Sequence, residues 1–427
     1  PFQMTAAQKR SLWEVLQDFE KSTPMNRLLQ GDVGSGKTVV AGAAAYQASL
    51  TCFQTALLAP TEILATQHAE TLSKLLSPFG IKIALLTGSV KKTAREELLK
   101  QIQNGDAQII VGTHALLQPT VKFHKLGFVV IDEQHRFGVK QRQELLVKSD
   151  NMPHLLSMTA TPIPRSLQLT LFGDLDISIL NQLPKGRKAI KTEIISPNSR
   201  EPMNQKISAE LENGRQAYFI APLVEESKIS ESESVEKLAK KLHTQFKNWR
   251  IGILHGKMPA EHKEKVMREF AAHELDILVA TTVVEVGVDV PNSTIIVIEN
   301  ADRFGLAQLH QLRGRVGRGE YQSYCFLVQS DSSAPTRRLR EIERSNDGFR
   351  LAEVDLQLRG AGEIYGTSQH GQLNLQIASL TDTKMIQSAS QSAEKFARKI
   401  AENPEILSKY PELASEVNKY QRLTTLN

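Results

Sequence analysis

A glycine-rich segment near the start of the chain contains residue types suited to binding phosphate. The segment LLQGDVGSGKTVV (28–40) fits the pattern G-x-x-x-x-G-K-[S/T] without a mismatch. Backbone without bulky side chains can curl so that several N–H groups point at one phosphate, while the lysine neutralises it and the hydroxyl binds Mg²⁺. An apolar run enters the segment and an Ala-rich helical run leaves it, so the helix N-terminus would face the phosphates. The residues predicted to hold the nucleotide are Gly31, Gly34, Gly36, Lys37 and Thr38.

Two acidic residues end a later apolar run, FVVIDE (128–133). Strand ends in open α/β sheets face the ligand crevice. One carboxylate there, Asp132, can hold Mg²⁺, and its neighbour Glu133 can deprotonate an attacking water. An acidic cap of the following helix is the alternative, but a strand end in a chain with a phosphate loop favours catalysis.

The segment HQLRGRVGR (310–318) places arginines and glycines together in the second half of the chain. A phosphoryl transition state gains negative charge, which an arginine from a second lobe can stabilise. A basic surface for nucleic acid is the alternative, and the phosphate loop in the first half favours the catalytic interpretation. The segment MTATPIPRS (158–166) indicates a rigid connector after another strand.

Short apolar runs alternate with helical segments, as in parallel sheets covered by helices. The runs predicted as strands are 27–30, 55–60, 81–88, 107–113, 128–133, 154–162, 216–222, 250–256, 275–282, 294–300 and 323–329. A Pro/Gly/Lys-rich passage at 181–193 indicates a hinge. The fold class predicted is α/β, with two doubly wound parallel-sheet lobes of five or six strands each.

The pattern changes after Ser330. Two short helices, 336–344 and 348–358, are predicted to form a hairpin with Asp347 as an N-cap, followed by a glycine-rich loop at 359–371. Five apolar residues then fall on one helical face and predict a tail that packs back on a lobe. They are Ile386, Ala389, Ala393, Phe396 and Ile400.

Composition is that of a globular protein: 427 residues, 41% apolar and 23% charged, with a net charge of +5. No run approaches the length of a transmembrane helix. Cys52 and Cys325 lie in apolar runs, which predicts core residues in a reducing compartment rather than a disulfide or a metal site. The chain begins PFQMTAAQ, without an initiating methionine or a signal peptide, which is typical of a fragment.

Taken together, these motifs resemble a superfamily 2 helicase, and more narrowly the catalytic part of the RecG-type branched-DNA translocases. The segments GDVGSGKT, APTEILATQH, DEQH, TATP, ATTVVEVGVDVPN and QLRGRVGR occur in the order found in that family. Residues 339–371 resemble its translocation motif, which is shared chiefly with the transcription-repair coupling factor. The resemblance implies two RecA-like lobes with an ATP cleft between them, at 1–185 and 186–333, and a translocation hairpin, loop and helical tail at 334–427.

The resemblance also implies roles for individual residues. For the nucleotide, it implies that Gln8 reads the adenine with help from Phe2, that Lys37 holds the phosphates and that Thr38 binds Mg²⁺. It implies that Asp132 binds Mg²⁺ through water and that Glu133 is the general base. From the second lobe, it implies that Gly287 and Asp289 line the cleft and that Arg315 and Arg318 contact the γ-phosphate. For movement on DNA, it implies coupling by His135, Thr159, Thr161, Arg359 and Gln369, and phosphate contacts by Thr61 and Thr113.

The implied cofactors are ATP and Mg²⁺, and the implied partners are double-stranded and branched DNA, including forks and Holliday junctions, with single-strand-binding protein as a further candidate. The resemblance also implies a monomer without membrane contact, in the bacterial cytoplasm at the nucleoid. The wedge domain that precedes the lobes in this family has no counterpart in the sequence. Two alternatives stay open: the motor of a transcription-repair coupling factor, and a nucleotide-dependent binding switch that does not translocate. The intact DEQH and RGRVGR segments speak against the switch, which needs neither a base nor arginine fingers.

Overall fold

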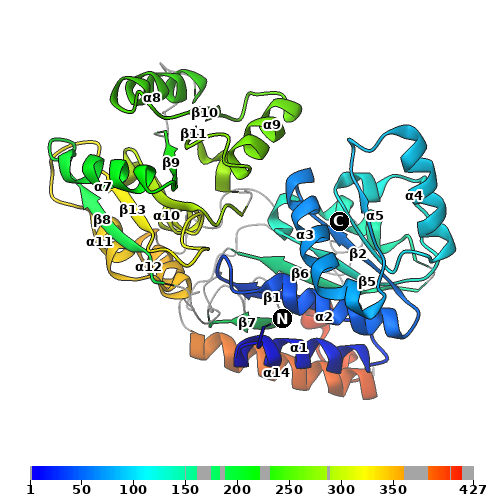
Figure 1. Cartoon of the computed structure of the whole chain (residues 1–427). Helices are drawn as coiled ribbons and strands as arrows, with labels where there is room; N and C mark the ends of the chain where they lie inside the picture. The colour runs from blue at the N-terminus through cyan, green and yellow to red at the C-terminus, as the bar shows by residue number, and fades with distance from the viewer. Residues whose placement is uncertain are drawn as a thin grey trace.

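The structure is a computed structural model in which two parallel β-sheets, each flanked by helices, form two lobes side by side (Figure 1). Apolar cores pack on both faces of each sheet. The fold therefore has the two doubly wound α/β lobes that the sequence predicts. The residues that the structure describes are 2–149, 151–160, 175–182, 188–221, 231–285, 289–359, 383–403 and 405–415.

The first lobe is built on a seven-stranded sheet in the order β3-β4-β2-β5-β6-β1-β7, with all neighbours parallel. Its strands are β1 (Asn26–Gly31), β2 (Gln54–Leu58), β3 (Ile83–Leu86), β4 (Ile109–Gly112), β5 (Leu126–Ile131), β6 (His154–Thr159) and β7 (Asp176–Leu180). Its described helices are α1 (Ala6–Phe19), α2 (Lys37–Leu50), α3 (Glu62–Leu76), α4 (Lys92–Asn104) and α5 (Val139–Leu146).

The second lobe is built on a six-stranded sheet in the order β10-β11-β9-β12-β13-β8, again with all neighbours parallel. Its strands are β8 (Lys191–Ile195), β9 (Gln216–Ile220), β10 (Ile251–Leu254), β11 (Ile277–Ala280), β12 (Ser293–Ile298) and β13 (Tyr324–Val328). Its described helices are α7 (Glu201–Glu212), α8 (Glu231–Gln245), α9 (Ala260–Ala271) and α10 (Leu306–Arg313).

Every apolar run predicted as a strand contains one, but the structure adds two strands that were not predicted, β7 and β8. Both lie at an edge of their sheet, where one flank of a strand is open and polar residues are tolerated. Their apolar signal is weak for that reason. The first sheet thus exceeds the five or six strands expected, and the end of the predicted hinge belongs to β8.

The predicted helical hairpin is confirmed as α11 (Arg337–Arg344) and α12 (Gly348–Arg359). Asp347 caps α12, because its Oδ1 accepts a hydrogen bond from the backbone N–H of Phe349 at 2.9 Å. Buried side chains of the hairpin complete the apolar core of the second lobe. They are Leu339, Ile342 and Leu351.

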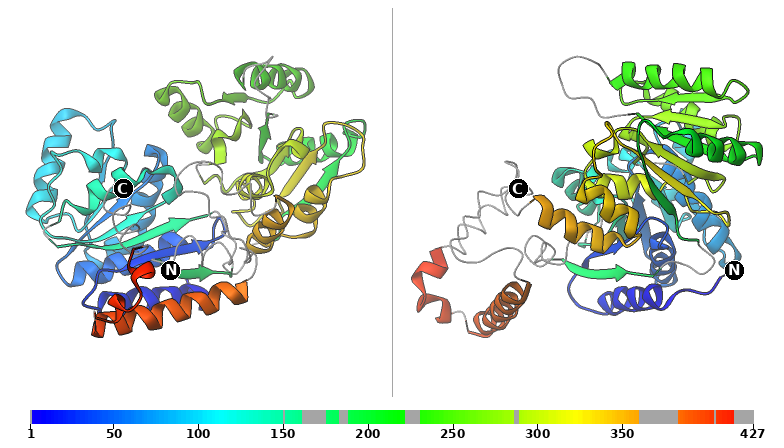
Figure 2. Two further views of the ribbon diagram at one scale, coloured as in Figure 1. Left: turned by 180° about the vertical axis from the view of Figure 1, so that it is seen from behind. Right: turned by 90° about the vertical axis from the view of Figure 1, so that its left-hand side faces the viewer.

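The tail forms α14 (Thr383–Glu402) and α15 (Glu405–Ser408), but its predicted packing on a lobe is wrong where the side chains are described. Ala389 and Ala393 are exposed, and the ring of Phe396 instead meets that of Tyr410 edge to face at 5.5 Å. In the right-hand view of Figure 2, α14 stands apart from α1. Alanine side chains offer little apolar area, so this face gains little from burial.

The two cysteines differ. Cys325 is buried in β13 as predicted, but Cys52 is exposed, so the prediction of a core residue is wrong there. Cys52 lies in the turn between α2 and β2 with φ of 60°, and that turn lifts the side chain to the surface. None of the helices in the described ranges is both long enough and apolar enough to cross a membrane.

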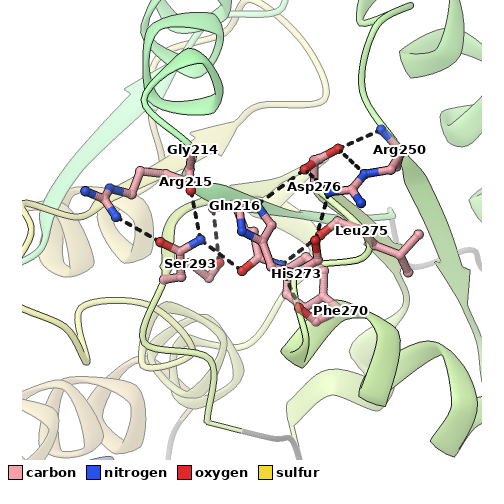
Figure 3. Close-up of polar contacts among 10 residues, drawn as sticks. Gly214, Arg215, Gln216, Arg250, Phe270, His273, Leu275, Asp276 and Ser293 are labelled. Carbon is pink, nitrogen blue, oxygen red and sulfur yellow. Dashed lines mark hydrogen bonds and ion pairs between the residues drawn. The ribbon is translucent and has the colours of Figure 1, made fainter.

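The lobes repeat one arrangement, since the order β3-β4-β2-β5-β6-β1 corresponds strand by strand to β10-β11-β9-β12-β13-β8. A buried glutamine starts each of the equivalent strands β2 and β9. Gln54 donates its amide to two backbone carbonyls at 2.9 and 2.8 Å. Gln216 does the same with Phe270 at 2.6 Å and Leu275 at 2.8 Å (Figure 3). A glutamine at the equivalent position thus holds the equivalent helix–strand connection in each lobe.

The repeat extends to the turn after the equivalent strands β5 and β12. Glu133 and Asn300, each two residues beyond its strand, both adopt left-handed backbone, with φ of 48° and 52°. An Arg-Phe-Gly segment follows in each lobe, at 136–138 and 303–305. In both, the glycine N–H donates to a glutamine three residues later, at 3.0 and 3.3 Å. The turns after β5 and β12 therefore share one backbone conformation and one hydrogen-bond pattern.

Candidate functional site at the cleft between the lobes

The phosphate loop has the geometry that its sequence predicts. Strand β1 ends at Gly31, helix α2 begins at Lys37, and Gly34 and Gly36 between them have φ of 75° and 87°. Only glycine adopts such angles without strain. The Lys37 Nζ donates to the carbonyl of Gly31 at 2.7 Å and to that of Asp32 at 3.2 Å. Burial lowers the pKa of Lys37, while the carboxylates of the site oppose that shift.

Gln8 lies beside this loop at the start of α1. Its Nε2 donates to the carbonyl of Ser35 at 2.8 Å, and its Oε1 accepts from the backbone N–H of Thr5 at 2.8 Å. A β-carbon at Gly36 would lie 2.3 Å from the Gln8 amide nitrogen, so this glycine is also needed for a close approach. Phe2 is exposed. Adenine recognition by Gln8 and Phe2 stays a prediction.

The two carboxylates predicted to act in catalysis follow β5 directly. Asp132 Oδ2 lies 2.8 Å from His68 Nε2, and Oδ1 accepts from the backbone N–H of Glu133 at 3.0 Å. Burial tends to raise the pKa of Asp132, but the hydrogen bond from His68 and the charge of Lys37 hold it below its ordinary value. Asp132 is thus held as a carboxylate.

Glu133 has the opposite electrostatic character. Burial, and then the charge of Asp132, raise the pKa of Glu133 above its ordinary value. Its Oε2 accepts from the backbone N–H of Ala160 at 3.4 Å and lies 3.6 Å from Nδ1 of His135, a half-exposed residue. A carboxyl with raised pKa is the type of group that accepts a proton in general base catalysis.

His68, on α3, was not singled out in the sequence, although Thr61 just before the same helix was implied to contact DNA phosphates. Its ring contacts Asp132 on one side, and its Nδ1 lies 3.4 Å from the Thr38 hydroxyl on the other. Ala65 and Leu72 share the buried face of α3 with His68 at helical spacing. That spacing was the available signal, because it places the histidine on the inward face.

Arg315 and Arg318 follow α10 and reach the same cavity from the second lobe. The Arg318 Nη1 lies 3.2 Å from Asp289 Oδ1, and its Nε donates to the carbonyl of Gly314 at 3.3 Å. Burial, and then the charge of Arg318, lower the pKa of Arg315 to about 10. A β-carbon at Gly314 would lie 2.9 Å from Val33 of the phosphate loop, so glycine permits the close approach of the lobes.

Three further contacts join the lobes at the cleft. Asp32 Oδ1 of the phosphate loop lies 2.5 Å from His310 Nε2 of α10. The side chain of Gln67 on α3 exchanges hydrogen bonds with the backbone of Asp289 at 3.2 and 3.5 Å. Ile63 on the same helix packs against the core of the second lobe.

A buried arginine that the sequence did not single out continues this connection to the hairpin. Arg313 Nη2 lies 2.9 Å from His310 Nδ1, and its Nη1 donates to the carbonyls of Ile342 at 2.6 Å and Ser345 at 2.9 Å. The phosphate loop is therefore linked by polar contacts, through α10, to the turn of the helical hairpin.

The other predicted residues lie as follows. Thr159 is buried at the end of β6, and Arg359 is the last residue of α12, with a side chain outside the described set. Thr61 caps α3 with its hydroxyl, at 3.3 Å from the N–H of Leu64, and Thr113 follows β4. Thr161, Gly287 and Gln369 lie outside the described residues.

One cavity of about 450 Å³ collects the charged groups of both lobes. The catalytic and phosphate-binding candidates that line it are Gly34, Gly36, Lys37, Thr38, Asp132, Glu133, Asp289, Arg315 and Arg318. Its size is in the range of small-molecule sites. Cations from two lobes with a carboxylate between them suit phosphoryl transfer to water.

Three family models match successive parts of the chain. The DEAD/DEAH box helicase model matches residues 5–170, and the helicase conserved C-terminal domain model matches residues 203–320. A third, described as ATP-dependent DNA helicase RecG, domain 3, C-terminal, matches residues 345–423.

Curated relatives named ATP-dependent DNA helicase RecG are similar along most of the chain. The protein of Synechocystis sp. is 49% identical over 427 residues, with 99% of this chain and 51% of that protein covered. The protein of Bacillus subtilis is 48% identical over 396 residues, covering 92% and 58%. The chain thus spans about half the length of the curated relatives it matches.

Solved structures agree with this similarity. A RecG bound to a three-way DNA junction has a TM-score of 0.76 and 41% identity, and the match covers 90% of this chain and 50% of that one. Dbp5 of S. cerevisiae, bound to RNA, has a TM-score of 0.56 at 19% identity, with 83% and 88% covered. At that identity the second match shows the shared two-lobed fold alone.

Proposed function

The chain belongs to the RecG family of ATP-dependent DNA helicases, and we propose that it is an ATP-driven motor that translocates along double-stranded and branched DNA. One observation carries the proposal. A single cavity receives a lysine and two carboxylates from the first lobe and two arginines from the second. A site completed only by two lobes can convert hydrolysis into relative movement of those lobes.

The chemistry follows from the position of each group. Glu133 accepts the proton of the water that attacks the γ-phosphate, and its raised pKa suits that task. Lys37 holds the phosphate oxygens in the ground state. Arg315 and Arg318 stabilise the charge that develops in the transition state, which is worth about 10³–10⁵ in rate for such arginines.

The residues present fit Mg²⁺. Thr38 and Asp132 line the cavity, and an oxygen of each lies within hydrogen-bonding distance of the His68 ring. Mg²⁺ is usually bound by one or two protein oxygens together with substrate phosphates. When bound, the ion would neutralise phosphate charge.

The substrate and coupling assignments rest on family membership and placement. A relative binds a three-way DNA junction, so the proposed substrate here is branched duplex DNA. Thr61 and Thr113 follow β2 and β4, which are neighbours in the sheet, so both lie at the edge proposed to contact DNA phosphates. The division into 1–185, 186–333 and 334–427 is proposed on the same basis, as are a monomeric state, action at nucleoid DNA in the cytoplasm and a partner role for single-strand-binding protein.

The residues proposed to couple hydrolysis to movement are His135, Thr159, Thr161, Arg359 and Gln369. The polar link from the phosphate loop through His310 and Arg313 to the hairpin supports this, because it joins the nucleotide site to the segment that ends at Arg359. We expect Arg359→Ala and Gln369→Ala to keep DNA-stimulated ATP hydrolysis and to lose displacement of a triplex strand. Proportional loss of both activities, or loss of neither, would speak against coupling.

The proposed function is tested by measuring ATP hydrolysis without DNA, with linear duplex and with a three-way junction. We expect DNA to stimulate hydrolysis, and Lys37→Ala to abolish it with and without DNA. Lys240→Ala, on the exposed face of α8, is the matched control and should hydrolyse like the parent chain. Hydrolysis that responds to no DNA would favour the nucleotide-dependent switch instead.

A further inference from the structure

We propose that His68 is a positioning residue that accepts the Thr38 hydroxyl proton in a hydrogen bond, which leaves the hydroxyl lone pairs free for a cation, and that it holds the Asp132 carboxylate in place. The inference rests on the proposed function, because it concerns the groups that would hold Mg²⁺ beside ATP. It gives α3 a role in the nucleotide site, in addition to the DNA phosphate contact implied for Thr61, which caps the same helix.

The ring of His68 lies between the two proposed ligands. Only 8% of the residue is exposed, and its two ring nitrogens face Asp132 Oδ2 at 2.8 Å and Thr38 Oγ1 at 3.4 Å. Thr38 belongs to α2 and Asp132 follows β5, so the histidine joins two elements that the chain does not connect locally.

The partners determine which nitrogen carries the proton. An ionised carboxylate can only accept, so Nε2 of His68 donates to Asp132. In the neutral ring Nδ1 is then an acceptor, and the Thr38 hydroxyl is the group that donates to it. With its proton directed to the ring, the hydroxyl presents its lone pairs elsewhere, and Thr38 lines the cavity. A hydroxyl that binds a cation needs this orientation.

The same contact completes the restraint of Asp132. One carboxylate oxygen accepts from the backbone N–H of Glu133 at 3.0 Å and the other from His68 at 2.8 Å. The ring is also buried, since only 8% of the residue is exposed. Hydrogen-bond partners of ligands typically change metal affinity about 10–100-fold when they are removed.

Three variants separate the polar role of His68 from its packing role. His68→Ala removes both, His68→Leu fills the space without hydrogen bonds, and His68→Gln restores one donor and one acceptor. The readout is binding of a fluorescent, non-hydrolysable ATP analogue, titrated with MgCl₂ and repeated in EDTA. His154→Gln is the control, because His154 accepts a hydrogen bond from the N–H of Met25 and lies outside the residues that line the cavity.

We expect His68→Leu and His68→Ala to raise the half-saturating Mg²⁺ concentration by about 10-fold or more, with nucleotide affinity in EDTA unchanged. His68→Gln should recover part of that loss, and His154→Gln should behave like the parent chain. If His68→Ala does not fold, the leucine variant decides the question.

Two results would overturn the proposal. One is an unchanged Mg²⁺ requirement in His68→Leu. The other is an equal loss of nucleotide affinity with and without Mg²⁺, which would make His68 a part of the nucleotide pocket itself. Because the binding assay contains no DNA, its outcome is independent of whether DNA stimulates hydrolysis. Failure of the motor proposal and failure of this one are therefore distinguishable.

Discussion

At the scale of single residues, the backbone conformation of Glu133 and the chemistry of its side chain have separate explanations. Its left-handed conformation recurs at Asn300 in the second lobe, so the turn is part of the fold and not a device for catalysis. What differs is the chemistry, because Asn300 cannot accept a proton as a base does. The repeated turn thus provides a backbone position, and the first lobe places a carboxylate there, which is the proposed base.

We expect Glu133→Gln to bind ATP nearly normally and to lose about 10²–10⁴ in single-turnover hydrolysis. Glutamine keeps an oxygen that can accept from the N–H of Ala160, but it cannot take a proton from water. Rapid-quench measurement on pre-bound ATP provides the test, with Glu144→Gln at the exposed end of α5 as a control. Hydrolysis at the parental rate would remove the assignment of Glu133 as the base.

A second prediction concerns Arg318. Because Arg318 is proposed to act mainly on charge that develops in the transition state, Arg318→Ala should lower kcat by about 10³ or more and raise KM for ATP little. Steady-state kinetics separates the two constants, and Arg340→Ala on the exposed surface of α11 controls for loss of charge. A large rise in KM with normal kcat would mean that the Asp289 contact is structural and that Arg318 binds the ground state.

At the scale of secondary structure elements, buried polar side chains fasten the ends of strands where backbone groups lack partners. The amide of Gln216 ties β9 to the connection between α9 and β11. The guanidinium of Arg27 on β1 ties α1 and β7 to the first sheet, through Asp18 at 2.6 Å and Ser178 at 3.0 Å. Such contacts are costly to remove, because a buried partner then stays without a hydrogen bond.

Gln216→Leu is therefore expected to lower the free energy of unfolding by about 1–3 kcal/mol, although it replaces a polar side chain with an apolar one in the interior. Urea unfolding followed by circular dichroism measures the change. Gln205→Leu, on the exposed face of α7, is the matched control and should change stability by less than about 0.5 kcal/mol. Equal stability of the two variants would contradict the role assigned to the Gln216 amide.

Asp18 provides a prediction about pH. Burial tends to raise the pKa of Asp18, but hydrogen bonds from Arg27 and Lys21 hold it below the ordinary value of 3.8. A lowered folded-state pKa stabilises the fold above the unfolded-state pKa, and that stability is lost as the pH falls through the folded-state value. Asp18→Asn should therefore be least stable relative to the parent chain at neutral pH, and the difference should shrink as the pH falls below about 4. Urea unfolding at pH 7 and at successively lower pH measures it, and a difference independent of pH would contradict the linkage.

At the scale of the whole molecule, two lobes with equivalent strand orders both contribute residues to the proposed nucleotide site. In the first lobe, the carboxylate after β5 faces a cavity with Lys37. In the second, Glu299 after the equivalent strand β12 is held by both Nη atoms of Arg200, at 2.6 and 2.9 Å. In the second lobe, this bidentate ion pair therefore engages the carboxylate at the equivalent strand end. The contribution of the second lobe to the cavity of the first includes Arg315 and Arg318.

The net charge of +5 and the proposed phosphate contacts lead to a prediction about DNA binding. If the chain neutralises Z phosphates, the logarithm of the affinity should fall with the logarithm of salt concentration at a slope of about −0.9Z. Fluorescence anisotropy with two duplexes of unrelated sequence, each at several NaCl concentrations, measures the slope and its independence of sequence. Affinity that is insensitive to salt would mean that base contacts dominate. Lys37→Ala should keep the parental slope, since its ammonium faces the nucleotide cavity.

Much of this protein follows from its sequence, because the decisive conformations are local. Glycines at the left-handed positions of the phosphate loop, continuous apolar runs in central strands and an aspartate before α12 each act on backbone a few residues away. These signals predicted the two lobes, the phosphate loop, the two carboxylates after β5 and the helical hairpin, whereas Asp289 was implied only by the family resemblance. Local signals were weak at β7 and β8, since an edge strand is covered on one flank only.

Contacts between distant parts of the chain were decided by the tertiary structure alone. His68 lies in a helix whose sequence gives no indication that Asp132, after another strand, meets its ring. His310 contacts Asp32 only because the lobes approach closely at Gly314 and Val33. Ala389 and Ala393 have helical spacing, but spacing along a helix does not specify what covers the face. Periodicity and propensity are properties of neighbouring residues, whereas these contacts depend on how complete sheets and lobes pack against each other.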